Sequence, residues 1–475
     1  MLNYFIPRGR GGIGEVLKVA IPLVVASLGH ALNLFTDRVM LSSYSPQAMA
    51  AAFPAGLTSF TLSCLFLGIA GYSGVFVAQY TGANEPHKAS LAVWQGIFVA
   101  IIGGIFMAGT CFFAEWLFAL CGHEKSLQPL EVTYFKILSQ MGFIPLVTAA
   151  LSCFWSGRAK NRMVMMVNLV ITLFNIPLNY LLIYGNKFHF GSRQLVIPEL
   201  GIAGAAWGTV SAGAIGLLIY LCAFCTKNHR KNFGTLSHFY APEIFVKLVR
   251  FGLPTGIQLV LDLATFNIFI ILLGKINETV LTASGVVFSA YSFAFNPMIG
   301  FGQTASILVG QGVGAKDIPY AEKCIRSARF LLLCYSILMI VVFVCYPELL
   351  FQIFKLPEGE VRSMTRIMLI FTVGYLIFDA ANILYSNAVK GAGDTYFVMV
   401  AGILLGWLAF AIPCIAAYWW FSGEAAISYF GSDRAQTWCW WVLWSICDVY
   451  IIMLGSIFYA RYKQGKWKKM SVISN

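Results

Sequence analysis

VAQYTGA at residues 77–83 returns as VGQGVGA at residues 309–315, 232 residues later along the chain. The same offset relates KVAIPLV (18–24) to RFGLPTG (250–256), and Arg158 to Lys390. One offset shared by three separated motifs indicates an internal repeat of two similar halves. We therefore predict an N-terminal lobe over residues 1–226, a basic linker over 227–247 and a C-terminal lobe over 248–475.

The composition places both halves in a membrane. Of the 475 residues, 59% are hydrophobic and only 11% are charged, and the mean hydropathy is +0.76. Soluble domains carry roughly 25% charged residues, and an apolar segment needs about 20 residues to cross a bilayer. We count twelve such segments, at residues 16–42, 48–80, 91–121, 131–156, 163–185, 200–225, 247–276, 281–312, 326–351, 364–390, 396–421 and 437–461.

Twelve spans in two repeated halves predict an all-α polytopic membrane protein with two pseudo-symmetric lobes of six transmembrane helices each. Because six is an even number, both halves enter the membrane from the same side, which makes the repeat parallel. Transporters built this way hold their substrate between the halves and alternate access by rocking one half against the other. A channel or a membrane enzyme has less need of this symmetry.

The net charge of +12 is explained by membrane topology rather than by a nucleic-acid partner. Lys and Arg gather in the loops and helix ends on the side of the two termini, which is the bias expected of cytoplasmic segments. We therefore expect a multi-pass protein of the cell (inner) membrane with both termini in the cytoplasm. The basic tail KQGKWKK (463–469) then faces the membrane lipid.

Four spans carry polar side chains at helical spacing, so that each set shares one face of its helix. Lipid cannot satisfy such a face, which must therefore line a cavity or pack on another helix. The four sets are His30, Asn33 and Asp37; Asn168, Thr172, Asn175 and Asn179; Thr255, Gln258, Asp262 and Thr265; and Tyr375, Asp379, Asn382 and Ser386. For the neutral residues, hydrogen bonding between helices, worth about 0.6 kcal/mol each, is an equally good explanation.

Asp262 and Asp379 differ from the neutral residues because a charge at bilayer depth is costly and usually marks an ion or substrate path. Neither has a basic residue within two turns of its own helix. Oxygen ligands suit Na+, and a buried carboxylate accepts a proton near neutral pH. We predict that these carboxylates bind a coupling cation, Na+ or H+, and that no other cofactor is needed. A cationic substrate that competes for the same charge gives antiport.

Three further titratable residues are open to more than one interpretation. Asp37 is followed by Arg38 and lies near the outer membrane boundary, so an ion pair is an alternative to a functional role. Asp448 lies midway along the last span with only Ser445 as polar company. His30 can titrate near neutral pH, but a single His in an apolar span can equally be a hydrogen-bonded structural residue.

Six motifs, in order along the chain, resemble the MATE family of multidrug and toxic compound extrusion transporters, and within it the NorM-like bacterial branch. The resemblance covers essentially the whole chain. It implies a V-shaped pair of six-helix lobes that exports amphipathic, often cationic drugs or toxins in exchange for Na+ or H+. We expect a monomer without enzymatic activity. The motifs are FTDRVML around Asp37, VAQYTGA, NIPLNYLLIYG (175–185), PELGIAGAAWGT ending at Thr209, GLPTGIQLVLD ending at Asp262, and YLIFDAANILYSNAVKGAGDT from Tyr375.

The resemblance also implies two sites. In the C-terminal lobe, a cation site carries over to Asp262, Asp379 and Tyr375, whose ring can add a cation–π contact. In the N-terminal lobe, a second site for cation or substrate carries over to Asp37, Asn175, Asn179 and Thr209. Two departures stand out: Asp262 occupies a position that is commonly Glu in this branch, and Asn179 a position where some relatives have a second Asp. The second departure removes a charge, so we favour the C-terminal site for coupling.

Two alternative functions remain. Lipid-linked oligosaccharide flippases of the same superfamily need a cationic cavity for pyrophosphate, whereas Lys and Arg are nearly absent from mid-span positions here. GAGD at 391–394 matches the GxGD pattern of intramembrane aspartyl proteases, which need two acids that share a proton. However, Asp394 follows Lys390 at a helix end, no paired Tyr-Asp lies on the preceding span, and so short a pattern gives many false positives.

Overall fold

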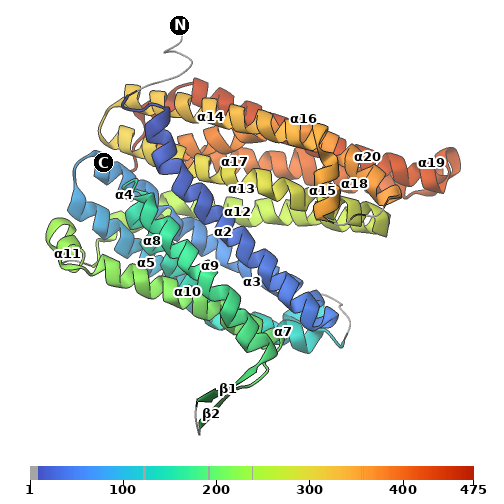
Figure 1. Ribbon diagram of the computed structural model, residues 1–475. Coiled ribbons are helices and arrows are strands. Elements are labelled where there is room, and N and C mark those ends of the chain that lie inside the picture. The colour runs from blue at the N-terminus through green and yellow to red at the C-terminus, as the bar shows by residue number, and fades with distance from the viewer. Residues whose placement is uncertain are drawn as a thin grey trace. The chain divides into compact units, whose positions relative to one another are not determined.

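The computed structural model describes residues 9–120, 125–190, 193–237, 239–354, 356 and 358–474, with the backbone alone at 187–190 and 193–196. The helices of the first half are α2 (Ile13–Tyr44), α3 (Pro46–Gly71), α4 (Ser73–Gly82), α5 (Pro86–Thr110), the 3-10 turn η1 (Cys111–Phe113), α6 (Ala114–Leu120), α7 (Gln128–Gln140), α8 (Phe143–Ser156), α9 (Asn161–Tyr184) and α10 (Ile202–Phe224). Figure 1 shows them in blue to green.

The second half continues in the same way. Its helices are α11 (Lys227–Phe233), α12 (Pro242–Ile276), α13 (Glu278–Gly314), α14 (Ile318–Cys345), α15 (Pro347–Ile353), α16 (Glu360–Ala392), α17 (Thr395–Leu404), the π-helical η2 (Leu405–Ala411), α18 (Ile412–Phe421), α19 (Glu424–Phe430), α20 (Ser432–Lys463) and the 3-10 turn η3 (Lys466–Lys469).

The prediction of an all-α membrane protein is confirmed. Within the described ranges, 11 helical segments are long and apolar enough to cross a membrane. The remaining predicted span, 281–312, falls in α13, a 37-residue helix whose apolar sequence is interrupted by Gly, Ser and Thr. A hairpin that was not predicted, β1 (Asn186–Phe190) paired antiparallel with β2 (Arg193–Ile197), extends beyond the ends of α9 and α10 (Figure 1).

The repeat is visible in the local backbone. VAQYTGA closes α4 and VGQGVGA closes α13. The residue after each motif, Asn84 and Lys316, adopts the left-handed conformation, with φ values of 60° and 56°. The next residue, Glu85 or Asp317, then takes the N-cap position of the following helix. Equal local geometry at equal offset gives the two halves the same helix–turn–helix step.

The described chain forms two compact units. Among the described residues, one unit, the C-terminal unit, contains 9–24, 258–313 and 317–471, and the other, the N-terminal unit, contains 25–257, 314–316 and 472–474. The division therefore falls inside α2 and α12 rather than in the predicted linker. The lobes are defined by sequence similarity, whereas the two units are defined by packing. The units therefore do not test the lobes, which stay a prediction.

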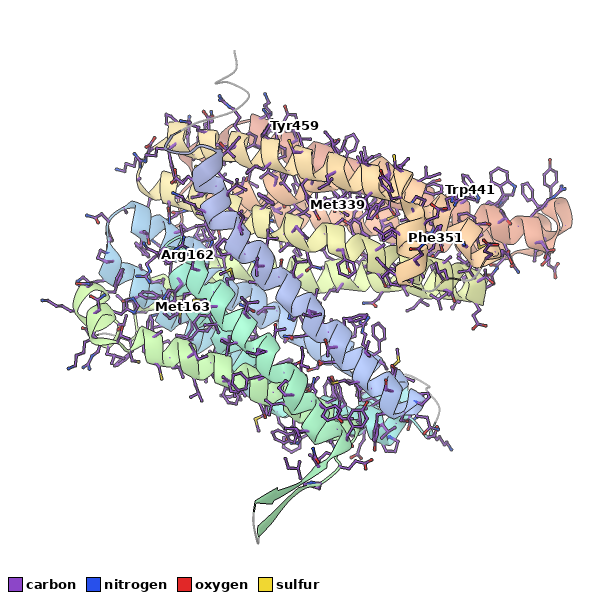
Figure 2. The ribbon with its side chains drawn as sticks, in the orientation of Figure 1. Arg162, Met163, Met339, Phe351, Trp441 and Tyr459 are labelled. Carbon is purple, nitrogen blue, oxygen red and sulfur yellow. The ribbon has the colours of Figure 1, made fainter. Side chains whose placement is uncertain are left out.

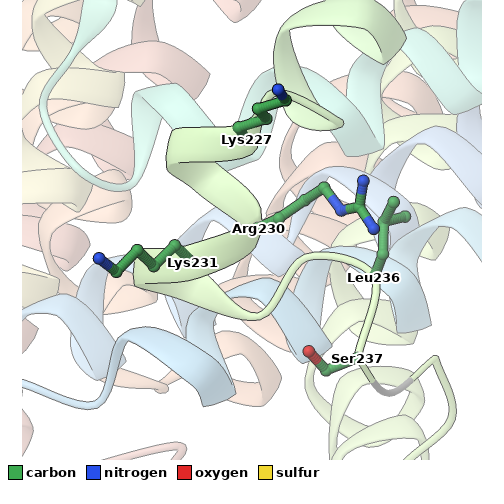
Figure 3. A pocket seen from close by; sticks show the side chains of 5 residues that line it. All are labelled: Lys227, Arg230, Lys231, Leu236 and Ser237. Carbon is green, nitrogen blue, oxygen red and sulfur yellow. The ribbon is translucent and has the colours of Figure 1, made fainter.

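In the N-terminal unit, the predicted linker is tied to α5 by side chains that bond its backbone. Ser90 Oγ donates to Phe233 O at 2.7 Å, Trp94 Nε1 to Thr235 O at 2.8 Å, and Gln95 Nε2 to Phe239 O at 3.0 Å. The tied linker forms a shallow cavity of about 370 Å³ lined by Lys227, Arg230, Lys231, Leu236 and Ser237 (Figure 3). The hydrogen bonds to α5 thus fix the backbone of the linker that carries these basic side chains.

In the C-terminal unit, α16 and α20 pack closely along their length. At Gly455 a Cβ atom would lie 2.3 Å from the Phe378 carbonyl oxygen, so only glycine permits this approach of the two backbones. Nearer the middle of α20, Trp444 is fully buried and stacks on Phe288 with ring centroids 5.4 Å apart. This packing fixes the helices that carry the predicted cation site.

Candidate cation-binding sites

The first site lies in the N-terminal unit, where α2, α9 and α10 bring together all four residues that the resemblance implies. Asn179 Nδ2 donates to Asp37 Oδ1 and, at 3.3 Å, to Asn175 Oδ1. Thr209 Oγ1 donates to Asp37 Oδ2 at 3.2 Å. We call this set, Asp37, Asn175, Asn179 and Thr209, the N-terminal carboxylate cluster.

Close packing of α10 on α9 builds this cluster. A Cβ atom at Gly208 would lie 1.9 Å from Asn179 Oδ1, so the absence of a side chain there lets α10 place Thr209 beside the carboxylate. Asp37 is 8% exposed and Asn179 0%. Asn179 Oδ1 is buried without a hydrogen-bond partner, which leaves an oxygen lone pair available to a cation. The cluster therefore offers one charge and several neutral oxygens.

The second site lies in the C-terminal unit around Asp379 on α16. Tyr291 on α13 donates its hydroxyl to Asp379 Oδ2, and Asn382 Nδ2 donates to Asp379 Oδ1 at 3.1 Å. Tyr375, the predicted aromatic partner, lies one turn before Asp379, with its ring 5.7 Å from that of Tyr291 and edge-on to it. The sequence prediction missed Tyr291, because the span that carries it showed no regular polar stripe.

Asp448 belongs beside this second site. A Cβ atom at Gly374 would lie 3.2 Å from Asp448 Oδ2, so the glycine of α16 makes room for the acid of α20. Asp448 interacts electrostatically with Tyr375, and its Oδ1 is buried without a hydrogen-bond partner. Asp379, Asp448, Tyr291, Tyr375 and Asn382 form what we call the C-terminal carboxylate cluster. The apolar sequence around Asp448 concealed this neighbourhood.

Asp262, on α12 of the same unit, has partners of its own. It contacts the Gln258 side chain one turn earlier and interacts electrostatically with Lys390. Asp262 has no basic residue within two turns of its own helix, as expected, but folding brings Lys390 of α16 to it. Tyr450 interacts electrostatically with both Asp262 and Asp379, which links the two acids.

Apart from His30, the other polar residues predicted to line a cavity divide into two groups. Some donate to backbone carbonyl oxygens, which supports the interpretation as hydrogen-bonding residues. Asn168 donates to Val164 O, and Thr172 donates to Gly29 O and Asn168 O. Thr265 donates to Asp262 O, and Ser386 donates to Ile383 O. Others keep a buried polar atom without a partner: Asn33, Thr255 and Gln258. His30 is exposed on α2.

In both clusters the groups that donate to the buried carboxylate are neutral; the N-terminal cluster has one acid, Asp37, and the C-terminal cluster has two, Asp379 and Asp448. Within the ranges that the structure describes, no three His, Cys, Asp or Glu side chains gather into a group that could hold a metal ion. The ligands on offer are carboxylate, amide and hydroxyl oxygens, which are the donors that hard cations prefer. Such a site can bind Na+ or take up a proton.

Removing the Tyr291 hydroxyl should tighten cation binding. The hydroxyl and an incoming cation compete for the same oxygen of Asp379, and a hydrogen bond to a charged group is worth about 1.5–3 kcal/mol. We expect Tyr291→Phe to lower the half-saturating concentration of the coupling cation at least about tenfold, at roughly 1.4 kcal/mol per factor of ten. The measurement is drug efflux from proteoliposomes as a function of Na+ concentration and of pH.

Tyr335→Phe is the matched control, because that hydroxyl donates to the Phe293 backbone at 3.1 Å in the same unit. A rise in the half-saturating concentration for Tyr291→Phe would contradict competition and would make Tyr291 a ligand of the cation instead.

The structure also decides the role of Asp394 in the GAGD motif. Arg461 Nε donates to Asp394 Oδ2 at 2.7 Å, and Arg461 Nη2 donates to Asp394 Oδ1 at 3.3 Å. The Arg461 guanidinium also lies 4.2 Å from the centre of the Phe397 ring. An acid held in a bidentate ion pair does not share a proton with a second acid. The alternative function of an intramembrane aspartyl protease is therefore wrong.

The comparisons with known proteins point in the same direction. The profile of the MatE family matches residues 22–181 and 254–411. A protein of Rhizobium meliloti named "Probable multidrug resistance protein NorM" is 23% identical over 410 residues, covering 84% of this chain and 86% of its own. "Multidrug resistance protein NorM" of Vibrio cholerae is 25% identical over 385 residues, covering 80% and 82%.

A solved structure has the same fold. It is described as the outward-facing conformation of a multidrug resistance MATE family transporter of the MOP superfamily. It aligns with a TM-score of 0.83 at 15% sequence identity and covers 98% of both chains. At this identity the likeness extends to the fold and not to the chemistry of the two clusters.

Proposed function

The chain belongs to the MATE family of transporters, and from that premise we propose that it is a secondary active exporter of amphipathic, often cationic drugs or toxins, driven by antiport with Na+ or H+. The observation that carries the proposal is the environment of Asp379 and Asp37. Both carboxylates are buried, and the groups bonded to them are the neutral side chains of Tyr, Asn and Thr.

A buried carboxylate whose partners are neutral needs a mobile counterion. Its charge is costly in a low-dielectric surrounding unless a cation is present, so binding of Na+ or H+ is favoured. A cationic drug that needs the same negative charge, or the conformation that the charge stabilises, is released when the coupling cation arrives. This negative linkage between cation and drug is the thermodynamic basis of antiport.

We assign coupling to the C-terminal carboxylate cluster and an accessory role to the N-terminal one. The C-terminal cluster contains a second acid, Asp448, which interacts electrostatically with Tyr375 as Asp379 does, and Asp262 lies in the same unit. The N-terminal cluster has one acid, because Asn179 provides an amide. The named relatives are bacterial proteins, which supports a bacterial inner membrane as the location, with both termini cytoplasmic by the distribution of basic residues.

Imposed gradients test the proposal. We expect proteoliposomes loaded with ethidium to lose it faster when either an inward Na+ gradient or an inward proton gradient is imposed, and one of the two to give most of the acceleration. Valinomycin with K+ clamps the membrane potential, so that each chemical gradient acts alone. An efflux rate that neither gradient changes would contradict cation coupling while leaving membership of the family untouched.

A further inference from the structure

A second cavity, outside the carboxylate clusters, lies in the C-terminal unit between α14, α16 and α20. Its volume is about 250 Å³, and its lining is polar at one end and apolar at the other. Arg329, Tyr385 and Tyr459 form the polar end, and Leu333, Ile377 and Phe378 form the apolar end. We call it the amphipathic groove; Tyr459 is labelled on α20 in Figure 2.

The polar end contains the guanidinium of Arg329, with which no carboxylate of the described residues pairs. Arg329 lies beside the Tyr385 hydroxyl, and the Tyr385 ring centroid is 5.0 Å from that of Tyr459. Glu322, two turns earlier on α14, pairs with Lys468 rather than with Arg329. Arg329 lies near the basic end of its span, where a side chain reaches the depth of lipid headgroups, and its planar guanidinium suits the oxygens of a phosphate.

The groove runs from the basic ends of its helices toward the middle of the spans. The ion pairs Glu322–Lys468 and Asp394–Arg461 bring the start of α14 and the ends of α16 and α20 to one side of the unit. From that side, Leu333 lies one turn beyond Arg329. At 1.5 Å per residue, Ile377 lies about 12 Å deeper than Tyr385.

The apolar end is open to the surroundings. Leu333 is 37% exposed, and Ile377 and Phe378 are both 39% exposed. On helices that cross a membrane, such side chains contact acyl chains. The order along the groove, first a cation with phenol hydroxyls and then aliphatic and aromatic surface, is the order of a phospholipid from headgroup to tail.

We propose that the amphipathic groove binds an anionic phospholipid, with its phosphate on Arg329 and the tyrosine hydroxyls and part of one acyl chain along Leu333, Ile377 and Phe378. A soluble phosphate would satisfy the arginine but would leave the apolar end unused, so burial of the chain favours the lipid. The site is separate from both carboxylate clusters and does not depend on the transport function.

Phe378 precedes Asp379 on α16. The bound lipid therefore packs against the same helical turn that holds the principal acid of the C-terminal carboxylate cluster.

Native mass spectrometry of the full chain, purified in detergent and stripped of lipid, tests the proposal. It is titrated with phosphatidylglycerol, with phosphatidylcholine of identical acyl chains, and with glycerophosphate. We expect one phosphatidylglycerol to bind at least about tenfold more tightly than phosphatidylcholine, and Arg329→Gln to remove that preference. Ala381→Trp fills the groove and keeps the arginine, so it should lose the bound lipid as well.

Lys231→Gln is the charge-matched control, because it removes one positive charge from the other cavity (Figure 3), whose lining has a single apolar side chain. It should keep the preference for phosphatidylglycerol. Three results would each overturn the proposal. They are equal affinity for phosphatidylglycerol and phosphatidylcholine, binding of glycerophosphate as tightly as phosphatidylglycerol, and a loss of the lipid preference in Lys231→Gln as large as that in Arg329→Gln. Lipid retained by Ala381→Trp would place the binding outside the groove and overturn it too.

Discussion

Asp379→Asn will reduce cation-driven drug export at least about 100-fold. The amide preserves the size of the side chain and keeps an acceptor oxygen for one of the two donors, Tyr291 and Asn382, but it removes the charge that attracts the cation. Loss of one partner of a buried charge pair costs about 3–5 kcal/mol, and each 1.4 kcal/mol is a factor of ten in binding. Efflux of ethidium from proteoliposomes under the effective gradient measures the change.

Asp433→Asn is the control for this substitution, since Asp433 is exposed at the start of α20 and belongs to neither carboxylate cluster. It should export at the parental rate. Asp262→Asn and Asp37→Asn should fall between the two, because each acid lies outside the C-terminal carboxylate cluster. Export by both Asp379→Asn and Asp262→Asn at the parental rate would remove these acids from the coupling site.

Arg461→Ala will be among the most destabilising single substitutions in the C-terminal unit. The side chains of Asp394 and Arg461 are only 6% and 13% exposed, and their bidentate pair joins the start of α17 to the end of α20. Truncation leaves the Asp394 carboxylate buried without its cation, at a cost of about 3–5 kcal/mol. The readout is the temperature at which half of the detergent-solubilised protein stays monodisperse.

Lys88→Ala provides the comparison, because Lys88 and Glu85 form an exposed pair at 2.7 Å with side chains 55% and 41% accessible. Such a pair is worth about 1 kcal/mol or less. Equal losses of stability in Arg461→Ala and Lys88→Ala would show that burial does not determine how much the Asp394–Arg461 pair stabilises the protein.

Sequence spacing predicted which residues share a helix face but not which helix that face meets. Asn175 and Asn179, one turn apart on α9, could be placed on one face from spacing alone, whereas their meeting with Asp37 and Thr209 depended on the family resemblance. Tyr291 could not be found in either way. Its hydroxyl differs from that of Tyr335 only through the neighbour that folding supplies.

Long-range pairing explains the remaining differences. Lys390 approaches Asp262, and Arg461 takes Asp394, across stretches of chain that no local pattern connects. The apolar sequence around Asp448 gives no sign of its neighbours. These neighbours lie on another helix, where Gly374 makes room for the carboxylate. In contrast, the repeat predicted local geometry well: Asn84 and Lys316, equivalent by offset, adopt the same left-handed backbone.

The central claim is that drug leaves as a cation enters at the C-terminal carboxylate cluster. Proteoliposomes loaded with ethidium, with no ion gradient imposed, allow both movements to be followed together: ethidium by fluorescence, Na+ by a radiolabel and protons by a pH-sensitive dye. We predict that the outward flow of ethidium drives uptake of Na+ or H+ in fixed proportion, and that both flows stop in Asp379→Asn. Ethidium efflux that proceeds without entry of either cation would contradict the account.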